Sequence, residues 1–162
     1  IGWALNIGVL TISDSGSKGQ RKDCSGDAIQ KYIEDSGHCV THRSIVSDDP
    51  EVIEEKLKNW ADSTAVDVVF TTGGTGLSTR DNTPEATMKI SEYLIPGIAE
   101  AMRLKTFDST PFSILSRGVA GVRSGSIIIN LPGSETGVKQ CIDVIFESII
   151  HAVDIVRDNT EH

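Results

Sequence analysis

The stretch Ile7–Ile12 (IGVLTI) decides the fold, because it is an unbroken apolar run rich in β-branched residues. Such a run is typical of a β-strand that is covered on both faces. Two other stretches, Val68–Thr72 (VVFTT) and Ser126–Leu131 (SIIINL), have the same character, and Val40–Val46 is a weaker candidate. Strands buried on both faces occur in parallel sheets, so the sequence predicts one sheet with helices packed on each side.

Helical patterns occupy the segments between these predicted strands. A first helix is expected within Ser25–Gly37, where apolar residues recur at helical spacing before a terminating glycine. Asp49–Pro50 combines a capping carboxylate with a proline at the first helical position, and Thr83–Glu85 repeats this arrangement. Pro96–Gly97 is expected to break the latter helix, and the longest helix is expected after Ser134.

This alternation of strands and helices predicts the α/β class, as a three-layer α/β/α fold with a mostly parallel sheet. The segment Val119–Ser126 contains glycines, and we expect it to supply one short antiparallel strand and a turn. The chain has 162 residues, for which one domain is the default. Residues 1–162 are therefore expected to form a single domain.

Composition narrows the range of partners. The chain carries 15 Lys+Arg and 23 Asp+Glu, a formal charge of −8, which argues against nucleic acid as a partner. No apolar run reaches the roughly 18 residues of a membrane span, so none is expected. The three cysteines form no C-x-x-C pair, and we expect them to be small buried residues of a reduced, cytoplasmic protein.

Hydroxyl and glycine residues follow three of the predicted strands. They lie in Ser13–Ser15 (SDS), in Thr71–Gly76 (TTGGTG) and in Asn130–Ser134 (NLPGS). Since ligands of open α/β sheets bind beyond the carboxyl ends of the strands, these loops are candidates for a phosphate site built from backbone N–H groups. The glycines have a second interpretation, a turn that needs positive φ. Ser134 likewise either caps a helix or faces a ligand.

Acidic residues beside such a phosphate site need an explanation, because they repel the ligand. Asp81 makes chemical sense there if it holds Mg²⁺, which commonly bridges phosphates through one or two carboxylates. One of Asp48 and Asp49 is expected to cap the helix at Pro50, which leaves the other free for a similar role. Arg80 either binds phosphate or pairs with a neighbouring acid.

Six motifs, taken in order and at their spacings, identify a family. They are LTISDS at Leu10–Ser15, TTGGTG at Thr71–Gly76, RDNTPEAT at Arg80–Thr87, PG at Pro96–Gly97, LSR at Leu115–Arg117 and NLPGS at Asn130–Ser134. With these motifs the sequence resembles the molybdopterin-binding domain of molybdenum cofactor biosynthesis, including molybdopterin adenylyltransferases, the gephyrin amino-terminal domain and the bacterial cofactor biosynthesis protein B. The likeness covers about residues 5 to 157.

The resemblance implies an activity and a set of site residues. Such proteins are usually homotrimers, or hexamers, and transfer AMP from MgATP to the terminal phosphate of molybdopterin, giving adenylylated molybdopterin and pyrophosphate. Asp48 and Asp81 would be the catalytic acids that hold Mg²⁺. The residues that would bind substrate or nucleotide are Thr11, Ser13, Asp14, Ser15, Thr72, Gly73, Gly74, Thr75, Gly76, Arg80, Pro132, Gly133 and Ser134.

Two other functions remain open at this stage. The same domain resembles a module of competence/damage-inducible proteins, which would make the chain a nucleotide pyrophosphate hydrolase. Some relatives would instead act as non-catalytic carriers or scaffolds for molybdopterin. The presence of both Asp48 and Asp81 favours the transferase. The sequence does not distinguish molybdenum from tungsten as the final metal, nor a trimer from a hexamer.

Overall fold

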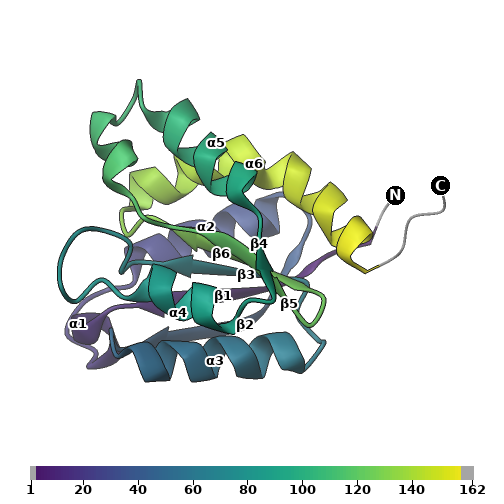
Figure 1. Cartoon of the computed structure of the whole chain (residues 1–162), viewed down its shortest axis with the longest axis horizontal. Coiled ribbons are helices and arrows are strands. Elements are labelled where there is room, and N and C mark those ends of the chain that lie inside the picture. The colour runs from purple at the N-terminus through teal and green to yellow at the C-terminus, as the bar shows by residue number, and fades with distance from the viewer. Residues whose placement is uncertain (1–2, 158–162) are drawn as a thin grey trace.

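A six-stranded sheet forms the middle layer of the structure, a computed structural model that describes residues 3–157 (Figure 1). The strands are β1 (Asn6–Ile12), β2 (Cys39–Val46), β3 (Val68–Thr72), β4 (Tyr93–Leu94), β5 (Ala120–Arg123) and β6 (Ser126–Leu131). Their order is β2-β1-β3-β6-β5-β4. The first four strands in this order are parallel, and β5 is antiparallel to both of its neighbours. The predicted fold class is confirmed.

Helices cover both faces of the sheet (Figure 1). They are α1 (Asp14–Ser17), α2 (Cys24–Asp35), α3 (Pro50–Asp62), α4 (Thr83–Ile90), α5 (Pro96–Thr106), the short 3₁₀ helix η1 (Pro111–Leu115) and α6 (Glu135–Val156). The helices α2, α5 and α6 share one hydrophobic core with the sheet, and α3 and α4 share the other. Within residues 3–157 no helix has the length and apolar character needed to cross a bilayer.

The central strands serve both cores, as their unbroken apolar sequence predicts. Ile7 and Val9 of β1 lie in the core beneath α2 and α6, while Leu10 and Ile12 lie in the opposite core. Side chains of a strand alternate between its faces, so a strand buried on both sides is apolar at most positions, and Thr11 is a buried polar residue near the end of β1. Gly8 leaves room for a neighbour, because a Cβ there would lie 2.9 Å from the ring of Trp60.

Some boundaries differ from those predicted. Pro96 begins α5 instead of ending the preceding helix, which already stops at Ile90 before the two-residue edge strand β4. Proline is well tolerated in the first turn of a helix, so the same residue fits both readings of the sequence. Thr83 is the first helical residue of α4 and not its cap, and its hydroxyl donates to Gly73 O at 2.9 Å.

Two smaller expectations were also wrong. The segment that follows Ile12 contains the short helix α1, whose N-cap is Ser13, whereas the sequence predicted only a loop. Cys24 and Cys39 are exposed, and only Cys141 is buried as expected. Burial raises the pKa of the Cys141 thiol to about 11, so this side chain stays neutral and packs as an apolar residue.

Candidate functional site

The carboxyl ends of β1, β3 and β6 lie side by side, and each is followed by a polar loop. Thr11 of β1 is in register with Thr72 of β3, and Thr72 is in register with Leu131 of β6. In the sheet, the strand that follows β1 in sequence lies on one side of it, and the strands that follow β3 lie on the opposite side. The strand order therefore reverses between β1 and β3. In an open α/β sheet this reversal marks the place where ligands bind.

A pocket of about 420 Å³ opens between these loops, and we call it the strand-end pocket. The residues predicted for substrate or nucleotide binding that line it are Thr11, Ser13, Thr72, Gly73, Gly133 and Ser134. Arg21 and Lys22, from the loop before α2, also line it and bring positive charge. The motifs miss these two residues, although a pair of basic residues ahead of a helix is a usable signal for an anion site.

Asp23 organises one wall of the strand-end pocket. Its carboxylate accepts hydrogen bonds from the Thr11 hydroxyl at 2.9 Å, from Gly26 N at 3.1 Å and from Arg43 Nη2 at 3.0 Å. The Asp23 side chain is only 8% exposed, and its buried carboxylate forms an ion pair with the guanidinium of Arg43. Because the Thr11 hydroxyl hydrogen is used within the protein, only its oxygen remains available to a ligand, as an acceptor.

The glycine loop contains two kinds of glycine. Gly73 and Gly74 have φ angles of 96° and 70°, and a Cβ on either would collide with neighbouring atoms. The turn interpretation therefore accounts for these two residues. Gly76 has no positive φ, and a Cβ there would lie 2.8 Å from Asp81 Oδ2. Gly76 thus permits the loop to pass close to the carboxylate of Asp81.

Asp48 and Asp81 come from different loops and interact through their charges. Burial, and then repulsion from Asp81, raises the pKa of the Asp48 carboxyl above its ordinary value. Asp48 Oδ2 accepts from Asp14 N at 3.2 Å, and Asp81 Oδ2 accepts from Ser78 N at 3.1 Å. Within residues 3–157 Asp48 Oδ1 and Asp81 Oδ1 accept no hydrogen bond, so these two oxygens remain available to a cation.

A cleft of about 500 Å³ adjoins this pair, lined in part by Asp14, Asp48, Arg80 and Asn82, and we call it the acid cleft. Arg80 forms an ion pair with Asp14, whose Oδ1 accepts from Asp48 N at 2.9 Å. Asp14 therefore lies in the acid cleft and not in the strand-end pocket with Ser13. In this structure Arg80 pairs with a neighbouring acid, the second of the two roles open to it.

The structure shows that Asp49 and Ser134, two candidate helix caps, each cap a helix. Asp49 caps α3, because its Oδ1 accepts from Glu51 N at 2.9 Å, and Asp48 is therefore free of this task. Ser134 caps α6 by accepting from Gly137 N at 3.0 Å. Its position also borders two pockets, so capping and ligand contact are compatible at Ser134.

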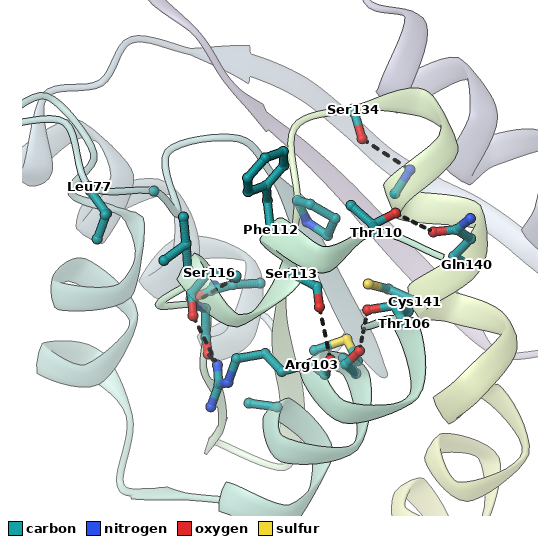
Figure 2. A pocket seen from close by; sticks show the side chains of 18 residues that line it. Leu77, Arg103, Thr106, Thr110, Phe112, Ser113, Ser116, Ser134, Gln140 and Cys141 are labelled. Atoms are coloured by element: carbon teal, nitrogen blue, oxygen red, sulfur yellow. Dashed lines mark hydrogen bonds between the residues drawn. The ribbon is translucent and has the colours of Figure 1, made fainter. Parts of the chain in front are cut away.

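An apolar pocket of about 430 Å³ lies on the other side of Ser134, between α5, η1 and α6 (Figure 2). Met102, Phe112 and Leu115 give it an apolar lining, and Arg103 adds a guanidinium. The predicted residues that line it are Gly76, Pro132 and Ser134. Apolar residues at helical spacing look like ordinary core in a sequence, which explains why this pocket is not visible from the motifs.

The remaining predicted residues line none of these three pockets; they are Ser15, Gly74, Thr75 and Asp81. Thr75 is buried, and Thr75 O accepts a hydrogen bond from Arg117 N at 2.8 Å. Within the described residues no group of three or more acidic, histidine or cysteine side chains could hold a metal ion. A pair of carboxylates nevertheless fits Mg²⁺, which takes hard oxygen ligands and usually completes its shell with water and substrate phosphates.

The structure is that of a three-layer α/β protein with a pocket at the carboxyl ends of its parallel strands, where ligands of open α/β sheets commonly bind. Residues 8–152 match the family described as "Probable molybdopterin binding domain". The chain belongs to this family.

Similar proteins carry names that refer to molybdopterin. A molybdopterin adenylyltransferase of Helicobacter pylori is 41% identical over 157 residues, which are 96% of this chain and 89% of that protein. A molybdopterin adenylyltransferase of Haemophilus influenzae is 36% identical over 143 residues, or 86% of this chain and 72% of that protein. The crystal structure of the molybdopterin biosynthesis enzyme MoaB from Thermus thermophilus has a TM-score of 0.88 at 41% identity, covering 94% of this chain and 96% of its own.

Proposed function

We propose that this protein is a molybdopterin adenylyltransferase, which transfers AMP from MgATP to the terminal phosphate of molybdopterin. The products are adenylylated molybdopterin and pyrophosphate. The observation that carries the proposal is the acid pair, Asp48 and Asp81, each with one carboxylate oxygen that accepts no hydrogen bond within residues 3–157. Asp48 lines the acid cleft, and Gly76, which lies close to the Asp81 carboxylate, lines the apolar pocket. Membership of the family and the names of similar proteins support it.

The reaction suits the residues available. An oxygen of the molybdopterin phosphate attacks the α-phosphorus of ATP, a P–O bond forms, and the bond to the β-phosphate oxygen breaks as pyrophosphate leaves. This step needs no protein nucleophile, but it needs position and neutralised charge. Asp48 and Asp81 would hold Mg²⁺, which neutralises phosphate charge when bound. Arg21 and Lys22 would neutralise further charge at the strand-end pocket.

The two pockets suit different parts of the substrates. Backbone N–H groups of the glycine loop, with the hydroxyl of Ser13, suit phosphate groups in the strand-end pocket, whereas the Thr72 hydroxyl donates to Pro132 O at 2.7 Å. The apolar pocket offers Phe112 and Leu115 to a flat ring. Ser134 borders both pockets, so a ligand with a ring and a phosphate could span them there.

We also propose a single domain over residues 1–162, a homotrimer or a hexamer, and a cytoplasmic location. One sheet with its two helical layers supports the single domain. Three unpaired cysteines support a reducing compartment. Exposed apolar side chains on α5 and η1 support self-association.

The test is pyrophosphate release by the purified protein with molybdopterin and MgATP. We expect Asp81→Asn to abolish release while molybdopterin affinity stays within about tenfold, or 1.4 kcal/mol. The control is Asp35→Asn, an exposed carboxylate on α2 that pairs with Lys31. Near-normal turnover of Asp81→Asn would remove this residue from the mechanism.

The same assay separates the other two functions. A molybdopterin carrier would bind the pterin without releasing pyrophosphate. A nucleotide hydrolase would release phosphate products from ATP in the absence of molybdopterin.

A further inference from the structure

Arg117 reaches from the segment between η1 and β5 to the loop that carries Asp81. Its backbone N–H donates to Thr75 O at 2.8 Å, and its Nε donates to Gly76 O at 2.8 Å. Its Nη2 donates to Asp81 O at 2.8 Å. Nη1 forms an ion pair with Glu85 in the first turn of α4.

These contacts fall at both ends of one loop, residues 76–81. A guanidinium is planar and holds its donors in a fixed fork, so the two carbonyl groups that it binds are kept at a set separation. The Asp81 carboxylate is attached to the second of these anchored peptide units. A lysine at this position would keep the charge but could not meet the same three acceptors at once.

Arg117 is itself held from the other side. Arg103 Nη1 donates to Ser116 O at 3.3 Å and to Gly118 O at 2.9 Å, the carbonyl groups on either side of Arg117 (Figure 2). Arg103 lies on α5, which packs in the core with α6. Helix α5 therefore holds Arg117 in place through Arg103, and Arg117 in turn holds the loop 76–81.

We propose that Arg117 is a positioning residue for AMP transfer, holding the loop 76–81 so that Asp81 stands beside Asp48 before substrate binds. The inference rests on the proposed function. Asp81 has to present a carboxylate to Mg²⁺ at a fixed place, and the side chain of Ser78, Thr79 or Arg80 gives the loop little burial of its own. Without the clamp the loop would sample positions in which Asp81 and Asp48 cannot share a cation.

The structure supplies a matched control in Arg123. All three nitrogens of this guanidinium also donate hydrogen bonds. Nε and Nη2 donate to the Asp62 carboxylate at 2.9 and 3.0 Å, and Nη1 donates to Ile90 O at 2.8 Å. It pairs with Ser126 at the start of β6, the end of the strand opposite to the site. Arg123→Lys therefore disturbs a similar clamp at a distance from the loop.

The experiment compares Arg117→Lys with Arg123→Lys in pyrophosphate release and in hydrogen exchange without ligands. For Arg117→Lys we expect kcat to fall at least tenfold, the Mg²⁺ concentration at half-maximal rate to rise, and molybdopterin KM to stay within threefold. We expect amides of residues 76–81 to exchange at least tenfold faster. Arg123→Lys should leave all four quantities near those of the wild type, even if its melting temperature falls as much as that of Arg117→Lys.

Each result has one meaning. A folded Arg117→Lys with wild-type kcat, Mg²⁺ dependence and loop exchange would overturn the positioning role while leaving the proposed function intact. A wild-type protein that releases no pyrophosphate would overturn both. If Arg117→Lys does not fold, Glu85→Gln removes only the ion-pair arm. It should raise loop exchange and lower kcat about threefold, and no change in either would overturn the role.

Discussion

At the scale of single residues, the site depends on carboxylates that the backbone holds by one oxygen. Asp48 Oδ2 accepts from Asp14 N at 3.2 Å, and Asp14 Oδ1 accepts from Asp48 N at 2.9 Å. This reciprocal pair joins the loop after β1 to the loop after β2. Asp48 is thereby kept near Asp81 at an electrostatic cost, which a bound cation would offset.

This electrostatic cost predicts that, in the absence of Mg²⁺, Asp48→Asn increases the stability of the protein by an amount that depends on pH. The pKa of Asp48 is raised in the fold, so wild-type stability rises as pH falls through that pKa. The amide carries no charge and can still accept from Asp14 N. We expect the variant to be more stable at pH 7 by up to about 1 kcal/mol, and the difference to shrink in acid. Thermal unfolding in EDTA measures this, and a less stable variant at pH 7 would contradict it.

Gly76→Ala tests the approach of the glycine loop to Asp81. Its backbone conformation suits alanine, but the new Cβ would lie 2.8 Å from Asp81 Oδ2 and has to displace it. We expect a folded protein whose affinity for ATP or molybdopterin falls at least about tenfold, or 1.4 kcal/mol. Gly97→Ala is the control, since a Cβ there has open space around it. Unchanged affinity in folded Gly76→Ala would leave this loop as a turn only.

At the residue scale, the motifs predict which acids and loops are candidates for the site better than they predict the hydrogen-bond and ion-pair partners of each residue. The charges of Asp48 and Asp81 repel each other in the structure, while their shared role with Mg²⁺ stays a prediction from the motifs. The ion pair of Asp14 with Arg80 could not be foreseen, since it joins residues that are 66 positions apart. Arg117 belongs to the LSR motif, yet its contacts with the glycine loop depend on the tertiary fold.

At the scale of helices and strands, hydrophobic pattern determined most of what could be predicted. The continuous apolar strands and the stripe on α6 leave one arrangement, with both faces of the sheet covered. Boundaries next to proline were less certain, because Pro96 can end one helix or begin another. The apolar pocket was missed because helix residues that line a pocket have the same periodicity as core residues.

The cap of α3 provides a prediction at this scale. Asp49 Oδ1 accepts from Glu51 N, so Asp49→Ala removes a side-chain cap and is expected to cost about 1 kcal/mol. In a domain of this size the melting temperature should fall by roughly 2–4 °C. Pyrophosphate release should stay within twofold of wild type, because Asp48 keeps its own contacts. A loss of activity as large as that of Asp81→Asn would contradict the division of roles between Asp48 and Asp49.

At the scale of the whole molecule, apolar side chains on α5 and η1 stand out. The most exposed are Leu104 and Phe112, at 73% and 77%, and Ile114, Leu115 and Phe107, the residue just after α5, are exposed as well. They belong to the outer helical layer that contains α5 (Figure 1). Large contiguous apolar surfaces on soluble proteins usually mark interaction sites, so we expect these exposed side chains to be covered by a second copy of the chain.

The final prediction concerns assembly and its link to activity. Sedimentation at micromolar concentration should give three times the 17.4 kDa of one chain, or a multiple of that mass. Leu104→Glu places a charge on the exposed apolar surface and should yield smaller species, whereas Ile155→Glu, at a half-exposed position on α6, should not. Phe112 and Leu115 also line the apolar pocket, so dissociation should open the pocket mouth to water and lower turnover. A wild-type monomer with full activity on dilution would show that one chain completes the site alone.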